Sequence, residues 1–456
     1  MISTFTFKVD FLTLVTVDIA LKSDMKKEEI SMQHPKMKWT YAGVDSHRDS
    51  HTIVFLDCFH DKLGELSVSN TTSGFQAFFK KAQKFCLPNT TIAWGFEDTS
   101  MYGRMFVKFL LGKKQLVKHV NANLVASERN SSNALHKTDS IDAECAAKVL
   151  INRFDKLPVA SSQDRYWILS SLVKRRESII KMNTMLKNQL HSLIAENYPS
   201  YRKFFFHLDG KGSLAFYEQY PSPARLADIT IGELTMFLKH HSNGSFKEDK
   251  AKLILDTIQT DGTFIIEHQD MRDFIIQSTI KQFKSNRTEI MTIDEKLTEV
   301  LDYFDYPLTS IKGIDTITAT KFIKEIGDIN RFPNAGALAR FAGIAPATYA
   351  SGTNNVQFAN ARGNRTLNKL FFHLAIKSAM LLGGPRHMNG ERMKLNSFFY
   401  DYYAKKISEG KTKKQSLKCV QRRLVNIVFR VMKHNVPYVN PPVEKVSAEA
   451  LEDKKS

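Results

Sequence analysis

Four acidic residues in the first third of the chain have the types and spacing of a divalent-metal site. They are Asp45, Glu97, Asp139 and Asp142. The first two each end an apolar run that predicts a buried strand, and the other two lie three residues apart where a helical pattern begins. Two Mg²⁺ ions held by carboxylates can bind both the attacking and the leaving oxygen of a phosphoryl transfer. The acids therefore predict phosphate-ester chemistry that depends on Mg²⁺ or Mn²⁺.

The pair Asp139 and Asp142 also has a simpler interpretation. Asp139 could be a helix N-cap, and Asp142 a first-turn acid that the helix dipole favours. Asp45 and Glu97 weaken this alternative, because an acid at the end of an apolar strand is costly without compensation. Asp98 falls on the opposite strand face, so Glu97 is the preferred candidate.

The elements that must position these acids follow the order three strands, helix, strand, helix, strand, helix. Strands are predicted at 39–46, 51–57, 63–69, 91–97 and 115–120. Helices are predicted at 73–85, 100–111 and 139–152. This is the layout of the ribonuclease-H-like α/β fold. Gly43 shares a strand face with Asp45, and Gly95 shares one with Glu97, so the two acids would end side by side if their strands are neighbours.

The overall composition indicates a polyanionic partner. Lysine and arginine number 65 against 47 aspartates and glutamates, a formal charge of +18, which is most often matched to DNA or RNA. The alternative is a basic protein without a nucleic-acid role. The four cysteines show no CxxC pair, which favours reduced thiols and argues against a zinc site. No apolar run approaches the ~20 residues that span a bilayer, so we expect a cytoplasmic protein.

A chain of 456 residues predicts several domains rather than one core. Changes of pattern divide it into a leader at 1–37 (disordered, or a mis-assigned start), a catalytic α/β domain at 38–160, a helical coiled-coil-like region at 161–305, a mostly helical C-terminal domain at 306–400, and a basic helix with a disordered tail at 401–456.

Two long helices with heptad-like spacing are predicted at 163–197 and about 272–304. They could pair with each other or with a second subunit, or be ordinary core helices. Polar residues interrupt both apolar seams and favour a specific pairing. These residues are Arg176, Asn183, Arg287 and Asp294.

Residues 309–327 predict two helical halves around a glycine turn, the pattern of a helix-hairpin-helix. In such a hairpin, glycine lets backbone amides approach a DNA phosphate. Asp315 stands where a second glycine is expected, and an acid facing a phosphate is unfavourable. A phosphate-binding role and a packing role therefore both stay open.

Ser351 lies beside glycine in what is predicted to be a polar loop, which is followed by a helix. Most such serines only make turns. A serine nucleophile needs a base or a metal, and no histidine stands close in sequence, so a metal is the favoured activator. Candidates to hold the phosphate backbone lie nearby. They are Arg340, Arg362, Asn364, Arg365 and Lys369.

In combination, these segments resemble the DEDD transposases of bacterial and archaeal insertion sequences, a family that includes the Piv-like DNA invertases. The matching segments include YAGVDSHRDSHTIVFLD, GFEDTSMYGRMFVKFL, KTDSIDAECAAKVL and ASGTNNVQFANARGNRTLNKLFFHLAIKSA, and with the helices between them they cover roughly 40–380. The resemblance implies a RuvC-like N-terminal domain, metal binding by Asp45, Glu97, Asp139 and Asp142, and Ser351 as the nucleophile that joins covalently to DNA.

The resemblance further implies a prokaryotic recombinase that acts on element ends and target DNA. It would act as a homo-oligomer, and some members are directed by a structured non-coding guide RNA. Two alternatives remain: a RuvC-like nuclease or Holliday-junction resolvase that hydrolyses DNA with the same acids, and an inactive nucleic-acid-binding remnant.

Overall fold

The computed structural model divides the chain into two compact units, Met1–Gln163 and Asp164–Ser456. The structure describes residues 34–97, 101–131, 138–160, 164–262, 267–351, 354–358, 360, 363–379 and 397–439. Most of the predicted leader and the end of the predicted tail lie outside these ranges.

A mixed five-stranded sheet is the centre of the N-terminal unit. Its strands are β1 (Trp39–Ser46), β2 (Ser50–Leu56), β3 (Lys62–Ser69), β4 (Thr91–Phe96) and β5 (Leu116–His119). Their order in the sheet is β3-β2-β1-β4-β5; β1, β2 and β3 are antiparallel neighbours, whereas β4 runs parallel to β1 and β5 parallel to β4. The five predicted strands are confirmed.

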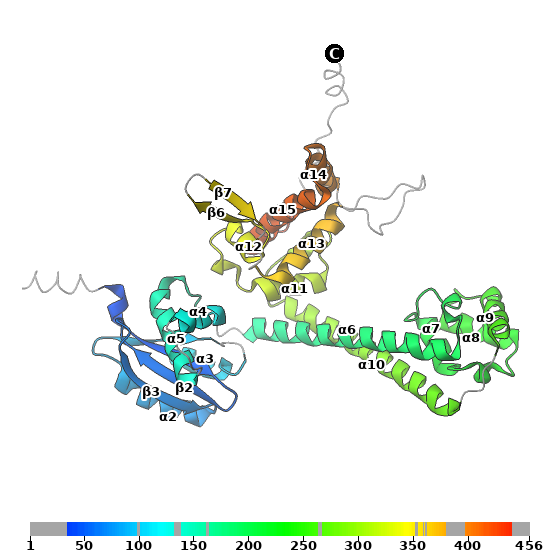
Figure 1. The fold of residues 1–456 in the computed structure, drawn as a ribbon, viewed down its shortest axis with the longest axis horizontal. Helices are drawn as coiled ribbons and strands as arrows, with labels where there is room; N and C mark the ends of the chain where they lie inside the picture. The colour runs from blue at the N-terminus through cyan, green and yellow to red at the C-terminus, as the bar shows by residue number, and fades with distance from the viewer. Residues whose placement is uncertain are drawn as a thin grey trace, which may run out of the picture. The chain divides into compact units, whose positions relative to one another are not determined.

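Helices cover both faces of this sheet (Figure 1). On one face lie α2 (Thr72–Ala82) and α3 (Arg104–Gly112), whose phenylalanines share a core with Val44, Ile53 and Trp94. On the other face lies α5 (Asp139–Asn152), flanked by α4 (Ala122–Ser131), a helix that the sequence did not predict. Short 3-10 turns complete the unit; they are η1 (Pro35–Lys38), η2 (Gln83–Phe85) and η3 (Phe154–Lys156).

Gly43 brings α5 close to the sheet. A Cβ atom at this position would lie 2.0 Å from the carbonyl oxygen of Ala143 and 2.3 Å from the amide of Ala147. The glycine is therefore required for the close approach of helix and strand. Since side chains alternate along β1, Asp45 points to the same face as Gly43, toward α5.

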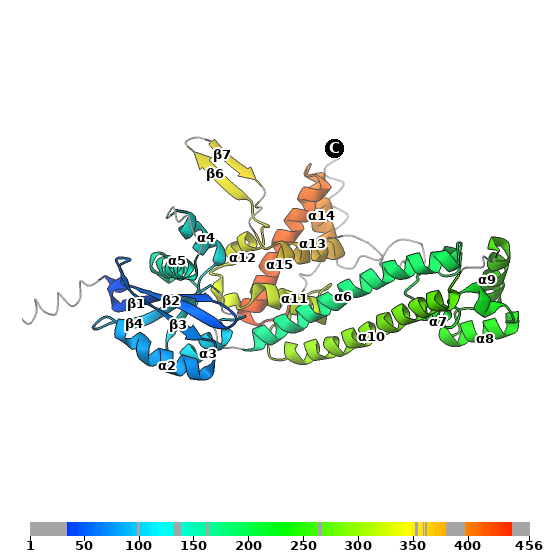
Figure 2. The ribbon, with the colours of Figure 1, turned by 60° about the horizontal axis from the view of Figure 1, so that its bottom comes forward.

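The second unit is organised by two long antiparallel helices, α6 (Asp164–Asn197) and α10 (Gln269–Leu301), which lie side by side in both views (Figures 1 and 2). This is the pairing with each other that the heptad pattern allowed. Arg176 of α6 forms an ion pair with Asp294 of α10. The buried amides of Asn183 and Asn286 form a hydrogen bond of 2.8 Å between the helices.

A separate hydrophobic core packs against each end of this helix pair. Leu190 and Ile194 of α6 pack with Ile276 of α10 and three short helices. These are α7 (Lys211–Gln219), α8 (Ile231–His241) and α9 (Glu248–Asp261), with the turns η4 (Tyr201–Lys203) and η5 (Pro223–Leu226).

At the other end, Leu169 of α6 and Val300 of α10 pack against the C-terminal elements. These are η6 (Leu308–Ser310), α11 (Thr316–Ile326), η7 (Ile329–Arg331), α12 (Ala335–Phe341), β6 (Ala347–Ser351), β7 (Asn354–Phe358), α13 (Arg365–Ala379), α14 (Ser397–Ser408) and α15 (Lys413–His434). Although rich in basic residues, α15 is a core helix, because Val420, Leu424 and Val428 are fully buried.

Two C-terminal segments differ from their predictions. The predicted polar loop around Ser351 is wrong: β6 and β7 form an antiparallel hairpin, in which Ser351 pairs with Asn354. Its strands carry the Thr, Tyr, Val and Phe residues that favour extended backbone. The predicted helical half before Gly313 is only the single turn η6, which follows directly on Pro307, a residue that lacks an amide donor.

Candidate metal centre

Asp45 lies one residue before the end of β1, on the sheet face that α5 covers. Its side chain is only 16% exposed, and its Oδ2 lies 3.1 Å from Nε2 of His47. Asp45 lies in β1, and His47 directly follows the strand. Because side chains alternate along a strand, two residues that are two positions apart point to the same face.

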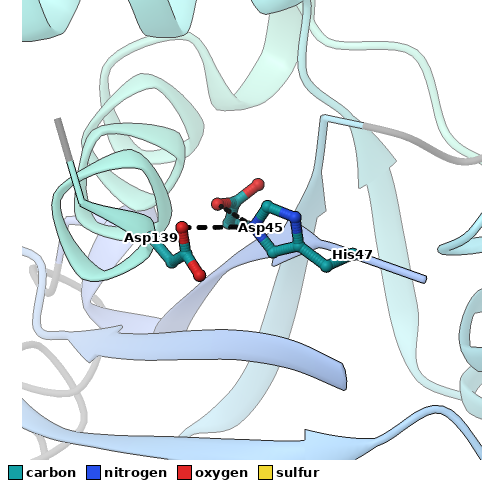
Figure 3. A group of neighbouring side chains, drawn as sticks. All are labelled: Asp45, His47 and Asp139. Carbon is teal, nitrogen blue, oxygen red and sulfur yellow. Dashed lines mark hydrogen bonds and ion pairs between the residues drawn. The ribbon is translucent and has the colours of Figure 1, made fainter. Parts of the chain in front are cut away.

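Asp139 approaches the same nitrogen from α5. Its Oδ1 lies 3.3 Å from Nε2 of His47, so this nitrogen faces two carboxylates that come from different elements (Figure 3). One potential ligand atom from each of Asp45, His47 and Asp139 lies within 4.8 Å of the others. The side chains of His47 and Asp139 are 50% and 60% exposed, so the cluster is open to solvent.

The N-cap of α5 is Thr138, whose hydroxyl accepts a hydrogen bond of 3.2 Å from the amide of Ile141. The alternative that Asp139 caps this helix is therefore wrong. Because the cap is provided by Thr138, the carboxylate of Asp139 lies in the first turn and faces Asp45 and His47 instead. This local structure brings together two of the four predicted acids.

Asp142 lies one helical turn further along α5 and is nearly buried, with 9% of its side chain exposed. It forms an ion pair with Arg129 of α4. A buried carboxylate is costly without a positive partner, so Arg129 compensates this acid in the structure. Asp142 is close enough to Asp45 for its charge to raise the pKa of that acid.

Glu97 follows β4 directly and is half-buried. The parallel strands β1 and β4 are neighbours, and their register pairs Gly43 with Gly95 and Val44 with Phe96. Asp45 and Glu97 are each the next residue along the chain, so both lie at the same end of these two strands. The expectation that these two strands are neighbours is confirmed.

The electrostatics of Asp45 fit a cation site. Burial raises the pKa of the Asp45 carboxyl, the neighbouring charges of Asp139 and Asp142 raise it further, and His47 opposes these effects. Burial is the largest of these effects, and a bound cation would offset it together with the charges of the two neighbouring acids. Carboxylate oxygens are the donors that Mg²⁺ and Mn²⁺ prefer, whereas the His47 imidazole is a softer donor than these ions select.

Sequence reasoning missed two members of this cluster. His47 could have been found from its position two residues after Asp45, since that spacing places both on one strand face. Arg129 could not have been found, because α4 itself was not predicted and the ion pair depends on its packing against α5.

The base of the hairpin that carries Ser351 is held by residues at the start of α13. The amide of Asn364 donates to the carbonyl of Phe341 at 2.7 Å, and the side-chain amide of Asn368 donates to the carbonyls of Ala342 and Gly343 at 2.9 and 3.0 Å. Gly363 contacts Gly343 so closely that a Cβ at position 363 would lie 2.3 Å from the Gly343 Cα.

Three of the predicted phosphate-binding side chains are exposed, namely Arg340, Arg365 and Lys369. Asn364 has internal partners instead: its Oδ1 accepts from the amide of Leu367 at 2.8 Å, and its Nδ2 donates to Glu325 at 2.8 Å. This side chain is used to cap α13 and to bind Glu325. Arg362 lies outside the described residues.

Comparisons with known families match both halves of the chain. Residues 42–199 match a DEDD-type IS110 family described as "Transposase", and residues 305–388 match the "Transposase IS116/IS110/IS902 family". The first match contains all four predicted acids, and the second contains Ser351.

Curated relatives include proteins of insertion elements. The chain is 22% identical over 422 residues to the "Insertion element IS116 uncharacterized 44.8 kDa protein" of Streptomyces clavuligerus, covering 92% of this chain and 100% of the relative. It is 24% identical over 312 residues to the IS110 43.6 kDa protein of Streptomyces coelicolor, covering 66% and 72%. The "Mini-circle putative transposase for IS117" of the same organism is 20% identical over 344 residues, covering 73% and 82%.

Among the described residues, no helix combines the length and the apolar character needed to cross a bilayer.

Proposed function

The chain belongs to the IS110-type transposase family, and on this premise we propose that it cuts and rejoins the DNA of an insertion sequence by metal-dependent phosphoryl transfer. Asp45 and Asp139 carry the proposal, because β1 and α5 bring both carboxylates to one imidazole nitrogen. Acids that meet from separate elements at a solvent-exposed sheet edge are suited to hold a cation that a DNA phosphate can reach.

Asp45, Glu97, Asp139 and Asp142 are the proposed ligands of Mg²⁺ or Mn²⁺. The metal would supply Lewis-acid stabilisation of the charge that develops on the phosphate oxygens. Asp45 and Asp139 would provide carboxylate oxygens directly, whereas Asp142 would have to exchange or share its ion pair with Arg129. His47 would hold the two carboxylates in place, as it does in the structure.

The N-terminal unit is proposed to have the ribonuclease-H-like fold of the RuvC type. The strand order β3-β2-β1-β4-β5, with three antiparallel strands followed by two parallel ones, supports this assignment. So does the position of the acids, which lie at the end of the central strand β1 and at the start of the helix that packs on it.

Ser351 is proposed as the nucleophile. Its hydroxyl oxygen would form a bond to phosphorus while a sugar oxygen leaves, which produces a phosphoserine; attack on this ester by a second sugar hydroxyl would rejoin the strand and release the serine. The position of Ser351 at the end of β6, beside the turn of a hairpin, supports this role because a hairpin end can enter a groove of bound DNA.

The exposed side chains of Arg340, Arg365 and Lys369 are proposed to hold the DNA backbone. Arg365 and Lys369 lie one turn apart on α13 and therefore share a helix face. The segment around Gly313 is a weaker candidate for DNA-phosphate binding than these side chains. The carboxylate of Asp315 caps α11 by accepting a hydrogen bond of 2.7 Å from the amide of Thr318.

A cleavage assay on DNA that carries the element ends tests this function. With Mg²⁺, the unaltered protein should cut and rejoin strands and form a protein–DNA adduct, and both activities should disappear in EDTA. Ser351→Ala should abolish the adduct and strand joining. If Ser351→Ala cuts as fast as the unaltered protein, the chain is a nuclease that uses water, and if cutting persists undiminished in EDTA, metal catalysis is excluded.

A further inference from the structure

The core of short helices at the far end of the α6–α10 pair (Figure 1) carries a groove that the proposed reaction does not use. Three cavities of about 230, 350 and 560 Å³ make up this groove. The first two share Phe206 and Ser213, and the last two share Lys211 and His241, so the three are neighbours. We call this surface the tip groove.

The first turn of α7 opens into the tip groove. The helix has 9 residues, and its N-cap is Gly210, which makes no side-chain capping bond. Among the described residues, the amides of Lys211, Gly212 and Ser213 make no hydrogen bond, as is usual in the first turn of a helix. Unpaired amides and the helix dipole together favour an anion at this position.

Ser213 provides an independent indication of a ligand. The residue is 2% exposed, and its hydroxyl has no hydrogen-bond partner among the described residues. A buried hydroxyl without a partner is costly, so a ligand atom that forms a hydrogen bond with it would be stabilised. Ser213 lines both of the smaller cavities, so a phosphate oxygen placed there would satisfy the hydroxyl and the neighbouring amides together.

The charges that line the groove are mainly positive. Arg202, Lys211 and Arg287 line it with exposed side chains. The acid Glu218, which also lines it, is paired with Lys284. The groove therefore presents a net positive surface to a ligand.

Phe206 adds an exposed aromatic ring to the groove, which the binding of a simple anion would not require. Its side chain is 95% exposed and lines the same two cavities as Ser213. A fully exposed phenylalanine beside a cationic groove is suited to stack on an unpaired base, whereas duplex DNA keeps its bases paired and internal. A phosphate and the adjoining base would thus both find partners within one cavity pair.

We propose that the tip groove binds a single-stranded nucleic acid, with one phosphate at the first turn of α7 and Ser213 and the adjacent base on Phe206. This site is separate from the acids of the N-terminal unit and does not depend on their chemistry. DNA and RNA share the phosphate and the base that the groove would recognise, so the experiment distinguishes them.

The test uses the full chain in EDTA, with 12-nucleotide single strands of DNA or RNA that carry one photoreactive 5-iodo-pyrimidine. Cross-linked peptides are mapped by mass spectrometry, and affinity is measured by fluorescence anisotropy. We expect a cross-link within residues 202–213, from the DNA strand, the RNA strand or both. Phe206→Ala should weaken single-strand binding about 5-fold or more and leave duplex binding unchanged.

Ser213→Ala separates a binding role from a structural one. It removes a buried hydroxyl that has no partner, so the melting temperature should stay the same or rise, while single-strand binding should weaken several-fold. Lys211→Ala should reduce the salt dependence of binding by roughly one phosphate contact. Phe274→Ala, which removes another exposed ring, and Lys252→Ala, which removes another exposed charge, are the matched controls.

Absence of a cross-link in 202–213, or equal binding by all the variants, would overturn the assignment. Asp45→Asn should retain the cross-link, so a failure of the cleavage chemistry and a failure of the tip groove are distinguishable.

Discussion

Asp45 and Asp139, which are 94 positions apart in the sequence, face the same Nε2 atom of His47 at 3.1 and 3.3 Å. One carboxylate comes from the central strand of the sheet and the other from the first turn of the helix that packs on it. The side chain of His47 is thus in contact with both acids.

Asp45→Asn should reduce DNA cleavage at least about 100-fold, because it removes a proposed ligand from the metal. The same change should not lower the melting temperature. Since the pKa of Asp45 is raised in the folded state, its ionisation opposes folding, and Asn removes that cost. Calorimetric titration with Mn²⁺ and thermal unfolding measure the two effects. Asp49→Asn, at an 80% exposed position, is the control and should change neither.

Arg129→Ala should destabilise the N-terminal unit by about 1–3 kcal/mol, because the nearly buried carboxylate of Asp142 loses the positive charge of Arg129. The double variant Arg129→Ala/Asp142→Asn should recover much of this loss, since the side chain at position 142 is then neutral. Chemical denaturation measures both. If the single and the double variant are equally stable, the contribution of Arg129 to stability does not come from its ion pair with Asp142.

Mixing Asp45→Asn with Ser351→Ala tests how the proposed nucleophile meets the acids. Each variant alone should be inactive in strand joining. If the acids of one subunit serve the serine of another, the mixture should regain a fraction of the activity, about a quarter or less. If no mixing ratio of the two proteins restores strand joining, both groups must come from one chain.

Asn183→Ala should destabilise the pair of long helices by about 1–3 kcal/mol, because the buried Nδ2 of Asn286 loses its acceptor, while its Oδ1 still accepts from Gln282. Replacing both asparagines with leucine should restore or exceed the original stability, since neither buried amide then remains. Urea unfolding of the two variants measures both changes in stability. A double variant as unstable as the single one would show that packing, not the amide pair, sets the stability.

Asp315→Ala should destabilise the C-terminal elements by about 1 kcal/mol through the loss of the α11 cap. Burial alone would raise the pKa of Asp315, but its hydrogen bonds to Thr318 and the charges of Lys377 and Lys321 outweigh burial and lower it. The contribution of this acid is therefore present above its unfolded pKa of about 3.9 and is lost as the pH falls further. Unaltered protein and variant should converge in stability in strong acid.

The sequence by itself located the strands and helices whose apolar residues recur at a regular spacing. Alternation along β1 identified the face that Asp45 shares with Gly43, and the heptads identified α6 and α10. Of the polar positions predicted in their seam, Arg176, Asn183 and Asp294 contact the facing helix, whereas the prediction of Arg287 is wrong: its side chain is exposed and donates to the carbonyl of Asp209, and the neighbouring Asn286 is the buried residue that pairs with Asn183. These features are local, because a strand or helix period assigns faces without knowledge of what packs against them.

Only the tertiary structure decided which groups become partners. Three arrangements depend on how the chain packs. His47 faces two carboxylates, Arg129 pairs with Asp142, and Ser213, whose hydroxyl has no partner among the described residues, lines the same cavity as the exposed Phe206. Single-residue patterns do not carry this information, because the cost of burying a charge or a hydroxyl is set by what the fold places next to it.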